Sequence, residues 1–454
     1  MTSESIKRGL YWFRNDLRLE DNPALTAMAG EVDDAVFVFV VDDRWFETTP
    51  HGFGRMGPHR MHFMMQSVQA LQLALLAKGH DLIVLMGTPA ACILGVAETF
   101  GCSKIYAQKE HTHEEVTEEN RIASAVSAQW TEGQTLIHPQ DLPFEVTGLP
   151  NVFSNFRKHV EIDGPPVRQI GTVTQWPSPV EVTTLLNGDW KGRCEANTCP
   201  PPKPDAMVFL GGADAGWKRL KTYFWDTQSL SRYKKTRNGL IGWDYSSKFS
   251  PWLAWGCLSA RQIHAEIIRY EQNFGANEST YWLVFELLWR DYFRFVAMQH
   301  GDRIWSASGI RGSARNSTRQ RPARSSPGNR DAPLPTTKTT AESWQKWTAG
   351  NTPEAFVNAN MRELQATGFM SNRGRQNVAS YAVHDLGLDW RRGAAWFERG
   401  LIDFDPCSNT GNWLYVAGLG NDPRPNRKFD LGWQTQRYDP DGAYRSFWNT
   451  PSKP

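Results

Sequence analysis

A short segment, residues 245–251, gathers groups that can bind an anion. It reads Tyr-Ser-Ser-Lys-Phe-Ser-Pro and places three serine hydroxyls and a lysine directly before helix-forming sequence. Hydroxyls, backbone N–H groups and an ammonium group together satisfy phosphate oxygens. The same residues also suit an ordinary cap at the start of a helix, so the segment alone leaves a phosphate site and a capping turn as alternatives.

A second segment, residues 281–295, combines aromatic rings with an acid and a base. At helical spacing Glu286, Trp289 and Arg290 project together. A carboxyl beside an indole is desolvated and can hold its proton near neutral pH, so Glu286 could donate a hydrogen bond to a ring carbonyl while Trp289 stacks on that ring. The alternative is an exposed Glu–Arg pair, one helical turn apart, on a core helix.

Two aspartates, Asp403 and Asp405, form a third polar group together with arginines in the segment 369–378. Two carboxylates at i and i+2 with arginines nearby could bracket the polar edge of a ring. They could equally form a structural cluster of ion pairs.

Other motifs point away from familiar chemistry. The GxGxxG pattern at 52–57 follows the second expected strand by about ten residues rather than the first, so we predict a loop that leads into a helix. The run 111–115 contains two histidines and two glutamates but no HExxH and no second cluster, so we predict a polar helix start and no metal site. The chain has no GxSxG or Walker A motif, which leaves hydrolase and kinase functions without support.

Alternating strand and helix patterns fill the first 140 residues. Apolar, β-branched or aromatic runs predict strands at 9–13, 35–41, 81–87, 104–108 and 135–139. Helical spacing predicts helices at 59–78, 89–100 and 114–129. Strands separated by helices predict βαβ units, and therefore a doubly wound parallel sheet.

The rest of the chain has a different organisation. Proline, glycine and polar residues dominate 140–206, which predicts a long linker on the surface. Beyond it the strand pattern disappears and helices are predicted at 214–229, 259–273, 278–300, 353–367, 373–386 and 390–402. We therefore expect an α/β domain at 1–139, a linker at 140–206 and an all-α domain at 207–454.

Composition is that of an ordinary globular protein. The 454 residues are 40% hydrophobic with a net charge of +2, so any basic surface must be local. No run approaches the roughly 18 apolar residues of a membrane span, no leader sequence is recognisable, and the six cysteines form no CxxC pair, from which we expect a cytoplasmic protein without a membrane partner. The basic stretch 306–340 is either a solvated loop or a flap that contacts phosphates.

Long motifs along nearly the whole chain resemble the photolyase/cryptochrome family, and most closely the DASH cryptochromes. They are YWFRNDLRLEDNPAL at 11–25, YSSKFSPWLAWGCLS at 245–259, FELLWRD at 285–291, NANMRELQATGFMSNRGRQNVAS at 358–380 and GNW at 411–413. The resemblance implies an α/β antenna domain and a helical FAD domain. It also implies light-driven repair of cyclobutane pyrimidine dimers, chiefly in single-stranded DNA, by electron transfer from reduced FAD.

The resemblance also assigns roles to residues. It implies an FAD site made by Tyr233, Ser246, Ser247, Lys248, Phe249, Ser250, Arg290, Arg375, Asp403, Asp405 and Asn409. Glu286, Trp289 and Asn409 take the catalytic positions, and substrate contacts fall to Glu286, Trp289, Asn372, Arg373, Gln376 and Tyr415. Trp413 and Trp390 match two members of the family's electron-transfer chain. Glu110 and Glu115 match the antenna position, for which 5,10-methenyltetrahydrofolate is the candidate chromophore.

The chain departs from the family at several positions. The distal tryptophan of the electron-transfer chain should fall near 336–337, where two threonines stand. Trp344 or Trp347 is a candidate substitute, although Trp347 has a counterpart of its own in the family. Thr410 replaces a tryptophan and Asn358 an aspartate. We therefore keep three functions open. The first is a photolyase, active as a monomer, that repairs pyrimidine dimers. The second is a blue-light photoreceptor that binds nucleic acid with little or no repair, and the third is a flavoprotein that has lost its light-driven function.

Overall fold

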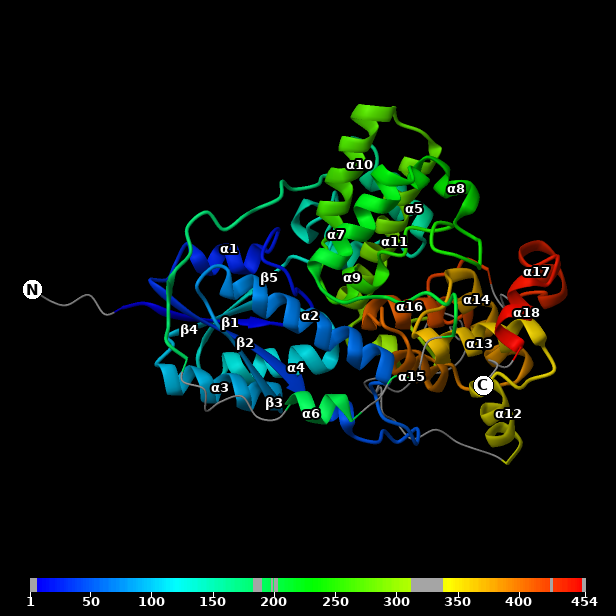
Figure 1. Ribbon diagram of the computed structural model, residues 1–454, viewed down its shortest axis with the longest axis horizontal. Coiled ribbons are helices and arrows are strands. Elements are labelled where there is room, and N and C mark those ends of the chain that lie inside the picture. Colours follow the sequence, from blue (N-terminus) through cyan, green and yellow to red (C-terminus); the bar gives the residue numbers. More distant parts are fainter. Residues whose placement is uncertain are drawn as a thin grey trace, which may run out of the picture.

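The computed structural model describes residues 6–182, 190–196, 199, 203–311, 338–424 and 428–450. Figure 1 shows a sheet flanked by helices, formed by the N-terminal part of the chain, beside a larger assembly of helices. The predicted combination of an α/β part and an all-α part is confirmed over the described residues. Most of the basic stretch 306–340, positions 336 and 337 included, lies outside them.

A parallel sheet with the strand order β3-β2-β1-β4-β5 organises the N-terminal part. Its strands are β1 (Arg8–Phe13), β2 (Asp34–Asp42), β3 (Leu82–Gly87), β4 (Lys104–Gln108) and β5 (Ser127–Thr131), and a two-residue strand β6 (Ser178–Pro179) pairs with the start of β2. Every residue of β2 is buried, because helices cover both faces of the sheet. The strand order reverses between β1 and β4, and sheets of this kind bind ligands at the carboxyl ends of the strands beside such a reversal.

Four helices connect these strands, namely α1 (Pro23–Ala29), α2 (Pro58–Leu76), α3 (Pro89–Phe100) and α4 (His113–Ala123). Three of them lie close to the predicted ranges. The GxGxxG run at 52–57 is, as predicted, a loop that leads into α2. Its last glycine caps α2 through the backbone alone.

The fifth strand is not where the sequence predicted it. β5 covers Ser127–Thr131 and overlaps the end of the predicted helix 114–129, which stops at Ala123, and residues 135–139 form no strand. Leu136 and Ile137 are fully buried, but their N–H groups donate to the Asp291 carboxylate of the helical part at 3.0 and 2.8 Å. Their apolar character therefore reflects packing between the two parts, whereas the edge strand β5 is only half-buried and carries no apolar run.

Twelve described helices build the C-terminal part. They are α7 (Ala213–Lys221), α8 (Tyr233–Thr236), α9 (Ser250–Ala254), α10 (Ala260–Phe274), α11 (Glu278–His300), α12 (Lys338–Thr348), α13 (Ala355–Thr367), α14 (Asn372–Ser380), α15 (Trp390–Gly400), α16 (Pro406–Val416), α17 (Leu431–Tyr438) and α18 (Ala443–Asn449). The predicted helices 214–229 and 373–386 each pass into a π-helical turn, η5 (Thr222–Asp226) and η8 (Tyr381–Asp385). The sequence patterns missed α16, because its glycine and asparagines break the apolar spacing.

The segment predicted as a surface linker also contributes to the core. It contains α5 (Phe153–Val160) and α6 (Trp190–Glu195), and Phe153 and Phe156 are buried among side chains of α11. After α5 the chain runs around the outside of the sheet, as Figure 1 shows. Only part of the segment 140–206 is therefore an exposed linker.

The two parts meet at a tight junction beside β1. Asp21 pairs with Arg261, and both side chains are almost fully buried. Gly256 has φ +66°, and a Cβ atom there would lie 2.1 Å from the carbonyl oxygen of Asn15. Glycine is therefore required at 256 by both its backbone conformation and the close approach of the chain that follows β1.

This junction generates a stability prediction. Gly256→Ala is expected to lower the free energy of unfolding by about 3 kcal/mol, from left-handed backbone strain and from the clash with Asn15. Gly242→Ala is the matched control, because Gly242 has φ +85° with open space around it, so only about 1 kcal/mol is expected there. Urea unfolding followed by tryptophan fluorescence measures both, and equal losses would show that the junction yields without cost.

Candidate functional site

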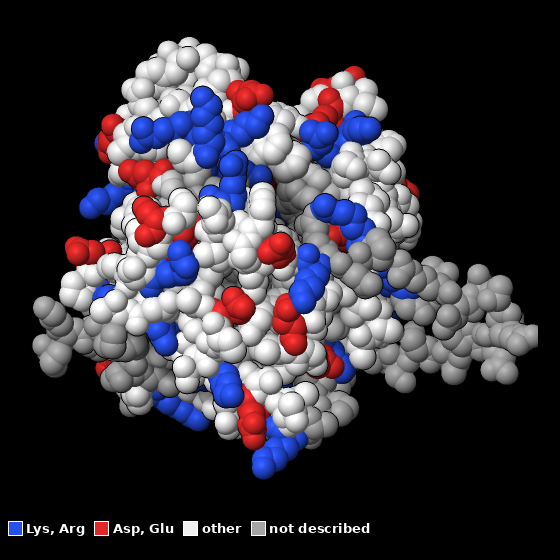
Figure 2. Space-filling model, turned by 90° about the vertical axis from the view of Figure 1, so that its right-hand side faces the viewer, with Lys and Arg blue, Asp and Glu red and all other residues white. Residues whose placement is uncertain are grey.

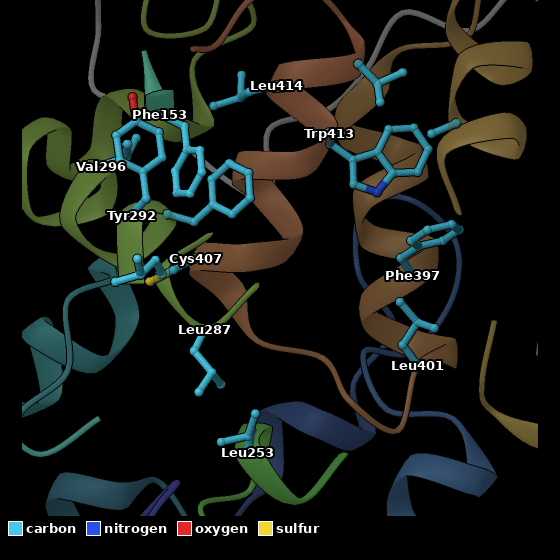
Figure 3. Close-up of a cluster of buried hydrophobic side chains, with 14 of the residues drawn as sticks. Phe153, Leu253, Leu287, Tyr292, Val296, Phe397, Leu401, Cys407, Trp413 and Leu414 are labelled. Atoms are coloured by element: carbon cyan, nitrogen blue, oxygen red, sulfur yellow. The ribbon is translucent and has the colours of Figure 1, made fainter. Parts of the chain in front are cut away.

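Two adjoining cavities lie among α9, α11, α14, α15 and α16. They contain about 970 and 550 Å³ of empty space and share Asn372, Arg375, Asp403, Asp405 and Ser408 in their walls. Concave spaces whose walls combine apolar and charged side chains are typical of cofactor sites. Figure 3 shows side chains around this region, with Phe397, Leu401 and Trp413 on one side of α16 and Leu253 and Leu287 below it.

The segment 245–251 forms one wall of the larger cavity. The wall contains the predicted residues Tyr233, Ser246, Ser247, Lys248, Phe249 and Ser250. A single side chain fixes this loop, because the Arg219 guanidinium donates to the carbonyl oxygens of Trp243, Ser246 and Ser247. The helix α9 has no side-chain cap, so the serines do not serve the capping role that the sequence left open.

Two polar atoms in the wall of the larger cavity have no hydrogen-bond partner among the described residues. They are Lys248 Nζ and Asp403 Oδ1, and both are buried. Burial, and then the nearby Arg219, lowers the pKa of Lys248 well below its ordinary value. An anion beside the lysine and N–H donors beside the aspartate would satisfy both groups, so the cavity fits a ligand that carries phosphates and a polar ring.

The two aspartates predicted to bracket a ring have different partners. Asp403 accepts from Arg375 at 2.7 Å with its side chain almost fully buried. Asp405 caps α16 through the N–H of Ser408 at 2.7 Å and pairs with the buried Arg294. Burial opposes the charge on Asp405, but Arg294 and Arg290 still hold the pKa of this carboxyl below its ordinary value. The Asp405 carboxylate therefore keeps its charge in the cavity wall, and Asp403 is held there by its pair with Arg375.

Asn409 lies one helical turn beyond Asp405 in the smaller cavity. Its Nδ2 donates to the carbonyl oxygen of Ala394 at 3.0 Å. This bond fixes the side-chain amide in one orientation. Its carbonyl oxygen remains available to accept a hydrogen bond from a ligand.

Glu286 stands in the wall of the larger cavity, but its partner is not the one suggested by spacing. It pairs with Arg237, at the end of α8. Arg290 instead donates to the carbonyl oxygens of Gln134 and Leu253. Burial raises the pKa of Glu286, and Arg237 opposes this rise. The sequence carried no signal for Arg237, because its partner is 49 residues away.

The remaining substrate-side residues gather near Glu286 but do not all reach the cavities. Asn372 lines both cavities and Gln376 the smaller one. Arg373 donates to Gln376 Oε1 at 2.9 Å. Trp289 stacks on Phe153, with ring centres 3.7 Å apart, and meets Tyr415 edge-on at 5.9 Å. Arg373, Trp289 and Tyr415 lie outside the walls of both cavities.

The expected electron-transfer tryptophans lie on neighbouring helices. Trp413 lines the smaller cavity and contacts Phe397 edge-on at 5.1 Å between ring centres. Trp390 is buried, and its indole N–H donates to the carbonyl oxygen of Ala307. The ring centre of Trp347 lies 6.4 Å from that of Trp413, and the ring centre of Trp344 lies 5.5 Å from that of Trp347. The candidate substitutes for the distal residue thus form a continuous row of rings with Trp413.

Asn358 and Thr410, the two other positions that depart from the family, are both buried. Asn358 binds the Thr352 N–H and hydroxyl with its side-chain oxygen, and so holds the loop before α13. Thr410 is fully buried on α16, and its hydroxyl has no hydrogen-bond partner among the described residues.

A third cavity lies at the carboxyl ends of β1 and β2. Its walls include aromatic rings, arginines and acids, among them Trp12, Arg14, Arg44, Trp45, Glu115, Trp255, Phe404 and Asp405. Of the two predicted antenna residues, Glu115 lines this cavity. Glu110 does not line this cavity. Its side chain is buried, with Oε2 3.6 Å from Nη1 of Arg294, and burial raises the pKa of Glu110 to about 7. Among the residues described, no cluster of histidine, cysteine and acids could hold a metal.

Comparison with known proteins identifies the family. Residues 9–175 match the DNA photolyase model and residues 282–450 match the FAD binding domain of DNA photolyase. The chain is 42% identical to Cryptochrome DASH of Synechocystis, over 97% of this chain and 86% of that protein. This chain belongs to the DASH cryptochromes. Cryptochrome DASH of Xenopus laevis is also 42% identical, over 96% of this chain and 81% of its relative.

Solved structures agree with this family. The crystal structure of Synechocystis cryptochrome has a TM-score of 0.88 and 41% identity, and the match covers 98% of this chain and 89% of that one. A class III photolyase from Agrobacterium tumefaciens shares the fold at 22% identity with a TM-score of 0.79. As a DASH cryptochrome the chain carries a family FAD-binding domain, and the unpartnered Lys248 and Asp403 atoms fit a cofactor with a pyrophosphate and a polar ring. No described helix is long and apolar enough to cross a membrane.

The ion pair in the cavity wall generates a binding prediction. Asp403→Asn removes the carboxylate that pairs with Arg375 and is expected to weaken FAD binding at least about tenfold, the scale of one buried charge-assisted bond. The FAD content after dialysis, measured by absorbance, tests this. Asp385→Asn is the control, because Asp385 pairs with Lys428 away from both cavities. Full retention of FAD by the Asp403 variant would contradict the assignment.

Proposed function

We propose that this protein repairs cyclobutane pyrimidine dimers, preferentially in single-stranded DNA, in a blue-light-dependent reaction that uses reduced FAD. One observation carries the proposal: Asp403 and Glu286 stand in the wall of the same cavity, and Asn409 lies in the adjoining one. A flavin ring held by Asp403 and a pyrimidine base that reaches Glu286 would therefore lie next to each other. Membership of the DASH cryptochromes supports the same activity.

The cofactor would supply the difficult chemistry. Reduced FAD, when bound, would supply the blue-light absorption and the electron that the dimer needs. Arg375 and Asp403 would hold the polar edge of the flavin ring, and the oriented amide of Asn409 would meet the same ring from α16. The segment 245–251, with Lys248, would bind the phosphates. Leu253, Leu287 and Leu401 provide apolar walls that exclude water from the site.

Glu286 would act on the dimer itself. Burial favours its protonated form, and a protonated carboxyl can donate a hydrogen bond to a pyrimidine carbonyl as negative charge develops there. Its present partner, Arg237, stabilises the ionised form instead. A dimer that enters the cavity further desolvates Glu286 and replaces Arg237 as its partner, so substrate binding itself favours the proton-donating form.

The preference for single strands follows from the cost of exposing the dimer. In a duplex the two linked bases of the dimer must leave the helical stack and their pairing partners to enter a cavity, at a cost of a few kcal/mol. In a single strand the dimer is already accessible, so this cost is absent and the same contacts give tighter binding.

The third cavity is the proposed antenna site. Its rings Trp12, Trp45 and Trp255 and its acid Glu115 suit a flat chromophore with donor groups, and we propose 5,10-methenyltetrahydrofolate as the occupant. Because Phe404 and Asp405 line both this third cavity and the smaller cavity of the helical part, a chromophore in the third cavity would lie close to the flavin.

The proposed repair activity has a direct test. Protein reduced chemically beforehand is illuminated with blue light and the loss of thymine dimers is measured in a single-stranded oligonucleotide and in the matching duplex. Prior reduction removes any dependence on the positions 336–337. We expect rapid loss in the single strand and little in the duplex. Absence of loss in both, with FAD bound and reduced, would favour the photoreceptor function.

Glu286 gives the proposal a residue-level test. Glu286→Ala is expected to lower the repair yield about tenfold or more with FAD still bound, because one transition-state hydrogen bond is lost. Glu98→Ala is the control, since Glu98 is exposed on α3 and lines none of the three cavities. The wild-type repair rate is expected to fall as pH rises through the raised pKa of Glu286, because the proton-donating form is lost. A pH-independent rate would remove Glu286 from this role.

A further inference from the structure

A ladder of aromatic rings leads outward from the catalytic region along α11. We propose that its outer end, Trp282 with Lys234 and Arg237, binds one unpaired nucleotide next to the dimer that enters the cavity. This inference rests on the proposed function, because it deepens the way in which the same site binds a single strand.

The ladder consists of four rings, Trp282, Phe285, Phe153 and Trp289. Trp282 stacks on Phe285 with ring centres 4.6 Å apart and an interplanar angle of 12°. Phe285 meets Phe153 edge-on at 5.2 Å, and Phe153 stacks on Trp289 at 3.7 Å. Trp282 and Phe285 are half-buried, so packing fixes the orientation of the rings while part of each remains exposed. Rings held in this way are a rigid platform, on which a base can stack when the cations over Trp282 turn from the ring to the phosphate of the bound strand.

Cations cover the outer end of this ladder. Lys234 Nζ lies 4.9 Å and the Arg237 guanidinium 5.3 Å from the centre of the Trp282 ring. Arg157 lies 5.5 Å from the centre of Phe285. Figure 2 shows Lys and Arg side chains gathered on the upper part of the face that carries α8. A phosphate of a bound strand would therefore meet two or three positive charges beside the rings.

The indole N–H of Trp282 distinguishes this residue from a structural tryptophan. Its Nε1 is buried and finds no acceptor among the residues that the structure describes. Trp225, in η5, is the contrasting case. It also has a cation on its ring, Arg269 at 4.6 Å from the ring centre, but its Nε1 donates to Glu266 at 3.0 Å. A buried donor without a partner is costly, and an acceptor on a base or phosphate would remove that cost.

The chemistry of the subsite favours an unpaired nucleotide over a duplex. A stacking ring needs the open face of a base, and paired bases bury both faces in the stack. Lys234 and Arg237 contact the backbone phosphate without regard to sequence. Arg237 also connects the subsite to the cavity, since a phosphate that attracts its guanidinium leaves Glu286 without its counter-ion.

The test is binding of the FAD-containing protein to a fluorescent, undamaged oligothymidylate, measured by anisotropy. Trp282→Ala is expected to weaken binding about tenfold, the scale of one base–aromatic stack, whereas Trp282→Phe keeps most of the affinity. Trp225→Ala is the matched control and should bind like wild type. Lys234→Gln, which leaves the rings in place, should reduce the slope of log affinity against log salt by about 0.7.

The outcomes separate this subsite from the proposed function. Unchanged binding by Trp282→Ala would overturn the subsite, and so would an equal loss on single-stranded and duplex DNA, which indicates a backbone contact only. If Trp282→Ala loses FAD, its affinity is not interpretable and the Lys234→Gln variant is used instead. For that variant an unchanged slope of log affinity against log salt overturns the proposal. Dimer repair by the same variants is measured in parallel. If the protein repairs dimers but Trp282→Ala binds the oligonucleotide like wild type, only the subsite is refuted. If Trp282→Ala weakens binding but the wild-type protein repairs no dimers, only the repair function is refuted.

Discussion

Arg294, in the middle of α11, is the charge on which the arrangement of the site depends. It is buried, pairs with Asp405 at the start of α16 and lies 3.6 Å from Glu110, which follows β4 of the sheet. A buried guanidinium is stable only with such partners, and loss of one partner typically costs several kcal/mol. Asp291, on the same helix, accepts the N–H groups of Leu136 and Ile137. α11 thus joins both parts of the molecule and presents Glu286 and Trp289 from the same rigid rod.

Much of this fold follows from local patterns in the sequence. The helix α11 was predicted to its ends, because asparagine and glycine cap a long apolar face. The strand at 135–139 was wrong, because an apolar run reports burial and not the element against which it is buried. Phe153, which supports Trp289, lies in the segment expected to be a surface linker. Its role depends on a contact with a helix more than a hundred residues away, which no local spacing encodes.

The site residues show the same division. The segment 245–251, Asp403 and Asp405 were identifiable by type and spacing, and the structure places them in one cavity region. The pair of Glu286 with Arg290, which the sequence left open as an alternative, does not form, because Arg290 instead donates to backbone carbonyls of two other segments. Arg237 and Arg219 fix the site from elsewhere in the chain. Charged side chains choose partners by three-dimensional proximity, so their pairing could not be read from i,i+4 spacing alone.

Phe404 and Asp405 belong to the walls of two cavities at once, one in the helical part and one at the end of the sheet. Two ligands that rest on the same two side chains cannot bind independently if either moves them. By thermodynamic reciprocity, an occupant of one cavity that changes the affinity of the other by some factor has its own affinity changed by the same factor. The shared wall therefore places Asp405, and through it the buried Arg294, at the point where occupation of one cavity would be felt in the other.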